Sequence, residues 1–557
     1  MSDLIYTAVT FAPVQGFIEK SRKLRDLYGS SYLLSFIAHA ICEAAKAQGC
    51  DIISPALPDI TQGLPNQIII QGQPGKEHIS NALNTSWRSI VKGCQQWIEE
   101  YVIKQSPRDW DRNWNHWSEH TWEFFYVEGR PGESISQVRQ RLNEAKRQRA
   151  WTAINWQGES STLSGADAVA YPDMANVLRT GTRSTIEAFY KKLSAELGEA
   201  IITPDEELSI PELIKRLITH AKVIEYLKQR NNTLSSSDNI DRLEATIRND
   251  LYVKTFKDLN RKDENRWTGW FMGDGDGASD YLKWEGERSS ALKDNELEGK
   301  QTQKFSKEMR DWGKAFKANR NHSALSYGRV IYAGGDDFLG VMYRTDEILA
   351  PKDCLSWLSQ FKSGVWNGLG TVDPAAKITT SIGFVWASPQ VPQRDVLQHT
   401  RSAEGSAKRA GKDRVAIRVL FAGGNHLEWV CPWWILEAGL FERYCDRNGV
   451  TNALDKASWT HFYNDVAVLE SRHAFGATMK ESCEVAIALM KVYFPDWPDL
   501  LSESHLWNEK NEYKVIHAGI LGNKQDYKPE GEKDINVSIN RWVINLAKVG
   551  FYLCSNT

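Results

Sequence analysis

The chain has 557 residues, enough for three or four domains at roughly 150 residues each. Its 68 lysines and arginines nearly balance its 71 aspartates and glutamates, so the net charge of −3 gives no overall positive field that would indicate nucleic-acid binding. No apolar run approaches the ~18 residues needed to span a membrane, and the first residues lack a secretory signal, so we expect a soluble, cytoplasmic protein without membrane contacts.

The first 155 residues read as one α+β domain. An apolar strand over residues 4–11 leads into a long amphipathic helix, and further strands are expected at residues 66–72 and 122–129, with a tryptophan-rich helical stretch between them. From residue 156 to residue 262 the pattern turns helical and is interrupted by a polar loop at 231–239, which predicts an intervening helical domain.

Basic side chains form two clusters in the first domain. Such clusters are explained by solvated helix faces at least as readily as by RNA contacts. The clusters are Lys20, Arg22, Lys23 and Arg25, and Lys146, Arg147 and Arg149.

Residues 263–425 contain a second set of strands separated by helical patterns. Their order, strand, helix, β-hairpin, helix, strand, helix, strand, is that of a ferredoxin-like domain with one added strand. The remaining residues, 426–557, read as a helical C-terminal domain with a polar insertion at 523–534. The sequence therefore predicts an α+β protein of four domains.

The hairpin of this second set carries the most informative motif, IYAGGDDFLGVMY. Gly334, Gly335, Asp336 and Asp337 join its two apolar strands, so adjacent carboxylates lie at the tip of a tight turn. Glycines permit a positive φ and leave room for a bulky anion such as a triphosphate. An ordinary Gly-Gly hairpin turn would give the same local pattern.

A second acidic motif, WFMGDGDGASDYL, ends an apolar strand some sixty residues earlier. In the ferredoxin-like order this strand lies beside the hairpin, so we expect Asp274 to meet Asp336 and Asp337 at one edge of the sheet. Two like charges 4 Å apart repel by about 1 kcal/mol in water and about 4 kcal/mol at an effective dielectric of 20, so the cluster indicates a bound divalent cation. Oxygen-only ligands suit Mg²⁺ or Mn²⁺, and two such ions are the usual means of activating a hydroxyl against a phosphate.

The same segment matches a calcium-binding EF-hand loop only in part. Asp274, Asp276 and Glu285 occupy the first, third and twelfth positions of such a loop, but Ala278 and Ser279 stand at the fifth and sixth, where an oxygen ligand and a glycine are needed. We therefore do not predict a calcium site.

Two lysines precede the last strand of the second set, in AEGSAKRAGKDRVAI. We expect a helix here, on which Lys408 and Lys412 lie four residues apart and so share a face, and both are candidates for binding phosphate oxygens. A solvated basic helix end, favoured by the helix dipole, is the alternative.

In combination these motifs resemble a known enzyme family. GGDD on a hairpin, GDGD on a preceding strand, TTSIGFVW and AKRAGKDR resemble the nucleotide-cyclase palm shared by diguanylate cyclases and the large subunit of type III CRISPR effector complexes. The N-terminal FAPVQGFIEKSRKLRDLYGSSYLLSFIAHAI and LPNQIII look like the first palm of the Cmr-type (type III-B) large subunit. The resemblance implies two ferredoxin-like palms, a helical intervening domain and a helical C-terminal domain. It implies one catalytic centre, because TAVTFAPVQGF and NQIIIQG contain no carboxylate.

The resemblance also implies an activity, which is the condensation of ATP into cyclic oligoadenylates when the guide-RNA complex binds a target RNA. Its expected partners are the guide (CRISPR) RNA, the target RNA, the subunit that binds the guide 5′ tag, the backbone subunits and the small helical subunits. By motif, the residues that would carry the reaction are Asp274, Asp336 and Asp337 as catalytic ligands of Mg²⁺ or Mn²⁺, Asp276 as a further metal ligand, and Gly334, Gly335, Lys408, Lys412 and Ser381 as nucleotide-binding residues.

The chain departs from the longer members of this family in two respects. They begin with a His-Asp nuclease domain, whereas the palm-like segment here starts at the first residues, so we expect no DNase activity. They also carry a CxxCG zinc knuckle, where this chain has Ser161 and Ser164 in ESSTLSG. Hydroxyls do not replace thiolates on zinc, so we predict no zinc there.

Two other functions are compatible with the sequence. One is a catalytically silent large subunit that anchors the guide tag and the small subunits, although an intact GGDD motif is unnecessary for that role. The other is a free-standing GGDEF-like nucleotide cyclase acting on GTP, or a template-independent polymerase, although no receiver, sensor or membrane segment accompanies the palm.

Overall fold

The computed structural model divides the chain into two compact units. The first unit consists of Met1–Leu259 and Leu282–Arg310, and the second of Asn260–Tyr281 and Asp311–Thr557, so the chain passes between the units three times. The described residues are 4–55, 60–61, 63, 67–104, 108–148, 156–174, 182–230, 238–251, 259, 266–291, 295–318, 327–344, 347–369, 377–447, 449–450, 458–527 and 533–554.

The first unit contains a four-stranded antiparallel sheet. Its strands are β1 (Tyr6–Ala12), β2 (Asp51–Ser54), β3 (Gln67–Gln71) and β4 (Glu123–Glu128), in the order β2-β3-β1-β4. With helices between β1 and β2 and between β3 and β4, this is the ferredoxin-like connectivity expected from the sequence. The four-residue strand β2 was not predicted. Every residue of β1 is buried, because β1 lies between β3 and β4 at the centre of the unit.

The intervening helical segment belongs to the same compact unit as this first palm. Helix α2 contacts α7, and α3 contacts α8. The predicted loop at 231–239 lies mostly outside the described residues, which resume at residue 238. The helices of this part of the chain are α1 (Val14–Glu19), α2 (Leu24–Ala47), α3 (Lys76–Ile98) with a π-helical turn η1 (Glu99–Ile103), α4 (Arg108–His120), α5 (Ile135–Arg147), α6 (Thr182–Leu197), α7 (Ile210–Leu217), α8 (Ala221–Arg230) and α10 (Asp238–Asp250).

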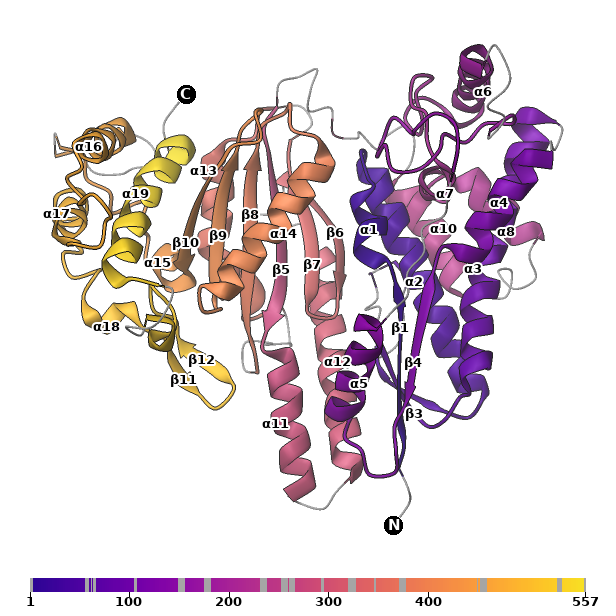
Figure 1. Ribbon diagram of the computed structural model, residues 1–557, viewed down its shortest axis with the longest axis horizontal. Coiled ribbons are helices and arrows are strands. Elements are labelled where there is room, and N and C mark those ends of the chain that lie inside the picture. The colour runs from indigo at the N-terminus through magenta and orange to yellow at the C-terminus, as the bar shows by residue number, and fades with distance from the viewer. Residues whose placement is uncertain are drawn as a thin grey trace. The chain divides into compact units, whose positions relative to one another are not determined.

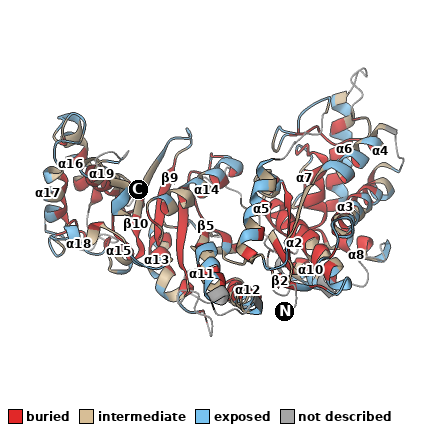
Figure 2. Cartoon of the chain, turned by 60° about the horizontal axis from the view of Figure 1, so that its bottom comes forward, coloured by how far each residue is buried: buried red, intermediate tan, exposed pale blue. Residues whose placement is uncertain are grey.

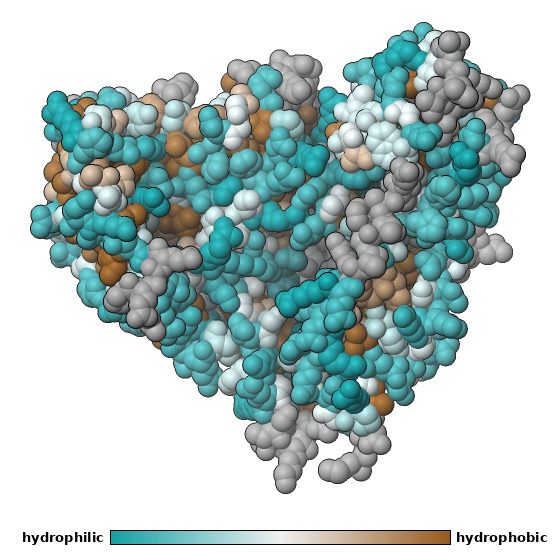
Figure 3. Space-filling model, viewed as in Figure 1, coloured by the Kyte–Doolittle hydropathy of each residue, from teal (hydrophilic) through white to brown (hydrophobic). Residues whose placement is uncertain are grey.

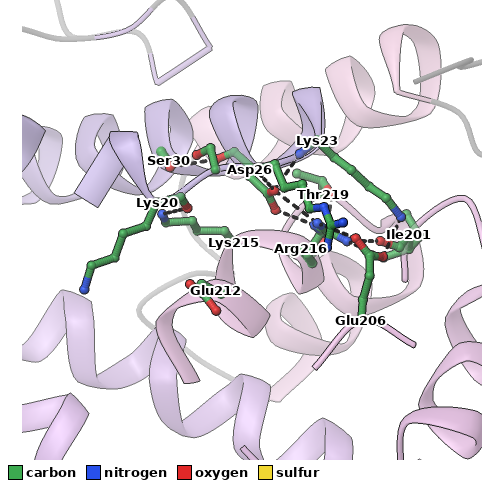
Figure 4. A network of polar contacts seen from close by, with 12 residues as sticks. Lys20, Lys23, Asp26, Ser30, Ile201, Glu206, Glu212, Lys215, Arg216 and Thr219 are labelled. Atoms are coloured by element: carbon green, nitrogen blue, oxygen red, sulfur yellow. Dashed lines mark hydrogen bonds and ion pairs between the residues drawn. The ribbon is translucent and has the colours of Figure 1, made fainter. Parts of the chain in front are cut away.

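A buried network of opposite charges ties α2 to α7 (Figure 4). The guanidinium of Arg216 on α7 pairs with Asp26 on α2 and, at 3.1 Å, with Glu206. Lys23 reaches the same Glu206 at 2.6 Å. The side chains of Arg216 and Asp26 are completely buried. Burial alone would raise the pKa of Glu206, but Arg216 and Lys23 lower it to about 2, so this carboxylate stays ionised.

Three residues of the first basic cluster form contacts in or beside this buried network. Lys20 pairs with Asp167 at 2.6 Å, Lys23 with Glu206, and the buried Arg25 donates hydrogen bonds to backbone carbonyls of the intervening segment. Arg25 is completely buried, whereas Lys20 and Lys23 remain partly exposed, so RNA contact by these two lysines stays a prediction. In the second cluster, Lys146 and Arg147 end α5, and Arg149 lies outside the described residues.

The second unit is built on a six-stranded sheet. Figure 1 shows these strands with α14 lying across one face. The predicted order of strands and helices is confirmed. Strands β8 and β9 are parallel and are connected by α14, and the other neighbouring strands are antiparallel. The strands, in sheet order, are β10 (His426–Pro432), β9 (Arg414–Leu420), β8 (Thr379–Ala387), β5 (Thr268–Asp276), β7 (Asp337–Met342) and β6 (Gly328–Gly334).

The two faces of this sheet are covered differently. Helix α14 (Gln393–Arg409) packs on β5, β8 and β9, so closely that a Cβ added at Gly383 would lie 2.2 Å from the amide nitrogen of Glu404. The other face carries an aromatic core in which Phe271 of β5 lies 4.5 Å, between ring centroids, from Trp357 of α13 (Pro351–Gln360). Figure 2 shows β5 and β9 buried.

Helices α11 (Ala278–Ala291) and α12 (Asn295–Ala318) each belong partly to both units, because the unit boundaries fall within them. They fill the connection between β5 and β6, where the sequence predicts a helical pattern.

The C-terminal part is mainly helical, as expected, but it also contains three strands. β10 extends the second palm sheet, and β11 (Glu509–Asn511) pairs with β12 (Lys514–His517). In the predicted polar insertion, residues 528–532 lie outside the described residues. The remaining elements are η3 (Phe361–Trp366), α15 (Trp433–Glu437), α16 (Trp459–Ser471), α17 (Glu484–Tyr493), α18 (Glu503–Leu506), η5 (Lys524–Tyr527) and α19 (Ile535–Cys554).

Among the described residues, no helix is both long and apolar enough to cross a lipid bilayer. The face of the molecule in Figure 3 is mostly hydrophilic, with apolar residues in scattered patches.

Candidate active site

The GGDD motif forms the predicted tight hairpin. Gly334 at the end of β6 pairs with Asp337 at the start of β7, which leaves only Gly335 and Asp336 in the turn. Gly335 has a φ of 71°, whereas Asp336 has no positive φ, the combination found in a type II′ turn with glycine at its first central position. The glycine at this position is therefore required by the backbone of the turn.

The strand register brings Asp274 and Asp337 together. Gly273 of β5 pairs with Phe338 of β7, so one step further along the two antiparallel strands Asp274 faces Asp337. Side chains alternate between the faces of a sheet, which places both carboxylates on the face opposite the Phe338 ring. The surrounding protein and the charges of Asp274 and Asp336 raise the pKa of Asp337 well above its usual range. Asp337 is nevertheless exposed to solvent.

Asp336 lies over the end of β5. The amide of Gly275 donates a hydrogen bond of 3.2 Å to the backbone carbonyl of Asp336, and a Cβ added at Gly275 would come within 2.9 Å of the Asp336 Cβ. Because Gly275 has no side chain, the turn approaches the strand closely enough to gather the carboxylates of Asp274, Asp336 and Asp337. The predicted juxtaposition of these three residues is present.

Lys408, at the end of α14, contacts this cluster. Its ammonium pairs with Asp274 and, at 2.7 Å, with Glu404 one turn earlier on the same helix. Burial alone would lower the pKa of Lys408, but the two carboxylates raise it above its usual value, so the lysine is charged at neutral pH. Of the two predicted lysines, this one lies directly at the acidic turn.

The donor set of the cluster suits a hard divalent cation. Carboxylate oxygens are preferred ligands of Mg²⁺ and Mn²⁺, and Asp274, Asp336 and Asp337 supply them from two adjacent backbone segments. Within the described ranges no three acidic, histidine or cysteine side chains stand in a ready-made metal geometry. Lys408 pairs with one oxygen of Asp274, Oδ2, and so partly neutralises the charge of this carboxylate.

Asp276 and Ser381 are joined by a buried hydrogen bond. Asp276 is buried, and its Oδ2 accepts hydrogen bonds from the hydroxyls of Thr379 (3.1 Å) and Ser381 (2.8 Å) and from the amide of Asp413 (2.8 Å). Burial raises the pKa of Asp276 to about 6. Ser381 is completely buried. Metal ligation by Asp276 and nucleotide contact by Ser381 stay predictions.

Lys412 does not share a helical face with Lys408. Helix α14 ends at Arg409, and Gly411 follows with a φ of 122°, so Lys412 lies in the loop before β9. Its ammonium lies 3.4 Å from the carboxylate of Asp280, just after the β5 motif. The four-residue spacing correctly placed both lysines near the acidic segment, but the glycine between them ends the helix.

Several residues near the site had not been singled out from the sequence. Glu404 is detectable in hindsight from its four-residue spacing to Lys408. Asp413, which pairs with Lys362 at 2.7 Å, and Tyr332, whose pKa is raised by burial and by Asp337, depend on tertiary packing that leaves no local signal.

In the first unit, the hydroxyls of Ser161 and Ser164 lie 3.3 Å apart, and Ser161 also contacts Glu212 at 3.3 Å. The absence of zinc from this segment stays a prediction.

Two family models match the sequence. The model described as CRISPR-associated protein Cmr2, N-terminal, covers residues 6–92, which contain β1, β2 and β3. The model described as Cas10/Cmr2, second palm domain, covers residues 268–416, from the start of β5 into β9. The second match includes the whole carboxylate cluster and both lysines.

Solved structures also resemble the chain. A chain of the type III-B Cmr-beta complex in its apo state is 12% identical, with a TM-score of 0.52 over 98% of this chain and 82% of that chain. A chain of the Cmr-beta complex bound to cognate target RNA is 12% identical, with a TM-score of 0.47 over 99% of this chain and 83% of that chain. A chain of the Csm1-Csm4 cassette in complex with cA4 is 13% identical, with a TM-score of 0.44 over 98% and 70%.

No curated protein matches the chain in sequence. The family assignment depends on the two family models, which match residues 6–92 and 268–416 in the expected order. The Cmr-beta chain, at 12% identity, shares the fold. The chain belongs to the Cas10/Cmr2 family of type III CRISPR effector large subunits.

Proposed function

We propose that this chain converts ATP into cyclic oligoadenylates within a type III-B effector complex when the guide RNA of that complex pairs with a target RNA. The observation that carries the proposal is the proximity of the Asp274 and Asp337 carboxyl groups at the adjoining ends of β5 and β7, with Asp336 in the adjoining turn. Like charges are seldom gathered in this way unless a cation or a reacting group uses them.

The chain's own residues hold and orient the nucleotide. Asp274, Asp336 and Asp337 would hold Mg²⁺ or Mn²⁺, which, when bound, favours attack of a ribose hydroxyl on an α-phosphate and neutralises the leaving pyrophosphate. Lys408 reaches the carboxylates from α14, and Lys412 extends from the following loop, so both supply positive charge to the triphosphate. Gly334 at the end of β6 and Gly335 in the turn have no side chains, so the nucleotide can approach the backbone there.

The partners we propose follow from the family. They are the guide RNA, the target RNA, the subunit that binds the guide 5′ tag, the backbone subunits and the small helical subunits. The assembled complex is therefore the proper material for any test of activity.

The decisive experiment incubates the purified guide-bound complex with labelled ATP and Mg²⁺ or Mn²⁺, with and without complementary RNA, and analyses the products by mass spectrometry. We expect cyclic adenylates only when the target RNA is present. Product from GTP rather than ATP would favour a GGDEF-like cyclase. No nucleotide product with either metal, in a fully assembled complex, would favour the silent scaffold.

A further inference from the structure

The loop that carries Lys412 has an unusual backbone. We call residues 410–413 the lysine loop. Gly411 has a φ of 122°, and the two following residues, Lys412 and Asp413, have φ values of 69° and 54°. A left-handed backbone is disfavoured for residues with side chains and persists only where the surroundings fix it. Two such residues in succession, at the site proposed to bind a triphosphate, raise the question of what holds them.

One side of the lysine loop is held from within the palm sheet. The amide of Asp413 donates to Oδ2 of Asp276 at 2.8 Å, and the carboxylate of Asp413 pairs with Lys362 at 2.7 Å. Thr379 and Ser381 in turn hold Asp276. These contacts fix where the loop joins β9. The end of α14 binds the two amides before it, because Gly411 donates to the carbonyl of Lys408 at 3.2 Å and Lys412 donates to the carbonyl of Ala407 at 3.3 Å. The carbonyls of Gly411 and Lys412 are bound from the other side.

The other side is held by Arg414 and Asn508, which we call the clamp. Arg414 donates from Nε to the carbonyl of Lys412 at 2.9 Å, and Asn508 donates from Nδ2 to the carbonyl of Gly411 at 2.7 Å. Both consecutive carbonyls of the strained segment are thus bound by side chains. Asn508 comes from the C-terminal part of the chain, almost one hundred residues beyond the loop.

The clamp is itself well anchored. Asn508 Oδ1 accepts hydrogen bonds from Arg414 at 3.1 Å and from the amide of Gly519 at 2.8 Å, while Arg414 also donates to the carbonyls of Gly519 (3.0 Å) and Ile520 (3.3 Å). A Cβ added at Gly522 would lie 2.0 Å from the carbonyl oxygen of Ala410. The C-terminal segment and the lysine loop therefore meet backbone to backbone.

We propose that Asn508 and Arg414 are positioning residues for Lys412, and that residues 508–522 are consequently part of the machinery of nucleotidyl transfer. The inference depends on the function proposed above. Lys412 is about two-fifths exposed, and its ammonium lies at the long distance of 3.4 Å from the carboxylate of Asp280. The direction in which its ammonium points is therefore set mainly by the backbone that the clamp holds.

The test is the Asn508→Asp variant in the assembled complex. It keeps the size of the side chain and the Oδ1 acceptor for Arg414 and Gly519, but it replaces the donor to Gly411 with a second acceptor. We expect about a ten-fold loss in the rate of oligoadenylate formation, equivalent to about 1.4 kcal/mol. The Lys412→Ala variant and the Asn508→Asp/Lys412→Ala double variant complete a cycle, in which the double variant should be no slower than Lys412→Ala alone.

Hydrogen exchange supplies a readout that does not depend on activity. In Asn508→Asp the amides of residues 411–413 should exchange about ten-fold faster, as expected for a loop that opens locally, whereas amides of β8 and β9 should be unchanged. Faster exchange throughout the second unit would mean that Asn508 supports the whole fold, and this would overturn the positioning role. Fully additive losses in the cycle would overturn it as well.

The matched control is Glu503→Gln. Glu503 lies in the same C-terminal segment and pairs with Lys524 at 3.0 Å, but both side chains are about two-thirds exposed, so this variant should leave activity unchanged. If the unaltered complex forms product and Asn508→Asp forms it equally fast, only the clamp inference fails. If the unaltered complex forms no product, the proposed function itself fails.

Discussion

The two sheets of this chain share one connectivity and differ in what their central strands carry. In the first unit, β1 lies between β3 and β4, is buried along its whole length and contains no carboxylate. In the second unit, the corresponding strand β5 lies between β8 and β7 and ends in Asp274 and Asp276. The connectivity alone therefore does not create a site.

The two units also differ in the connection between the second and third strands of the sheet. The β6 and β7 strands are joined by two residues, which brings Asp336 and Asp337 to the end of β5. In the first unit, β2 ends at Ser54 and β3 begins only at Gln67. A tight turn is what allows a hairpin to present side chains at a fixed distance from the neighbouring strand.

The two units differ most in how their charged side chains are paired. In the first unit, Arg216 meets two carboxylates of opposite charge in the interior, which satisfies all three groups. In the second, Asp337 meets Asp274 and Asp336, and their repulsion is relieved only in part by Lys408. The first arrangement stabilises the fold, whereas the second lowers the stability of the fold, as is common at functional sites.

The largest effect is expected from Asp336→Ala combined with Asp337→Ala. Oligoadenylate formation should fall by about 10³-fold or more, because the groups that stabilise the transferring phosphate are lost. The thermal stability should stay equal or rise, since like charges are removed from the turn. Mass spectrometry of the products and a thermal melt of the complex measure the two outcomes.

The control for this pair is Asp496→Asn, an exposed acid of the same unit that should change neither quantity. If the double variant no longer assembles with the guide RNA and partner subunits, the hairpin has a structural function instead.

The next effect concerns the buried network of the first unit. Arg216→Ala should lower the free energy of unfolding by about 3–5 kcal/mol, because two carboxylates stay behind in the interior without their partner. Urea unfolding followed by tryptophan fluorescence measures the change. Arg183→Ala is the matched control, because Arg183 also pairs with several glutamates but is 59% exposed, so little change is expected. Equal losses in the two variants would show that burial does not set the strength of this network.

A smaller effect should appear as a pH dependence of the first unit. Burial lowers the pKa of Lys215 to about 8, despite the nearby Asp26 and Glu212. Between pH 8 and 10.5 the unfolded chain therefore holds this proton while the folded chain has lost it, so stability rises with pH across this window. Relative to Lys215→Met, the unaltered protein should gain up to about 3 kcal/mol of unfolding free energy there.

Urea titrations of both proteins at several pH values test this prediction. A constant difference between them from pH 7 to pH 10.5 would contradict it, because the Lys215 amine would then bind its proton equally in the folded and unfolded states.

The smallest expected effect is that of chelation on stability. Metal removal should stop oligoadenylate formation, which added Mg²⁺ or Mn²⁺ restores, but it should not shift the thermal unfolding of the protein without nucleotide. Elemental analysis should find no stoichiometric zinc, since Ser161 and Ser164 provide no thiolates. A zinc ion that is released on unfolding would overturn this prediction and would give the first unit a metal of its own.

Much of the architecture was accessible from the sequence because its signals are local. The two-residue turn of GGDD, the apolar strands around it and the alternation of strands with helices predict the second palm, and the carboxylates of Asp274, Asp336 and Asp337 follow from that order. Strand β2 was missed because four residues carry too little pattern, and β10 because HLEWVCP lies next to segments that read as helical.

The roles of individual side chains were less accessible. Asp276 and Ser381 lie on strands that lead to the site, and their burial depends on tertiary contacts, among them the hydrogen bond from the Asp413 amide to Asp276. The position of Lys412 depends on a left-handed backbone that Asn508 helps to fix from almost one hundred residues away. Such long-range constraints leave no periodicity in the sequence.

The three passages of the chain between its compact units have a consequence for genetic dissection. A single cut before Asn260 keeps every strand of the second palm on one chain, but it also keeps residues 282–310, which belong to the first unit. A palm free of first-unit residues therefore requires a short bridge in place of residues 282–310. An N-terminal deletion that continued past residue 276 would remove strand β5, and with it Asp274, from the sheet that carries Asp336 and Asp337.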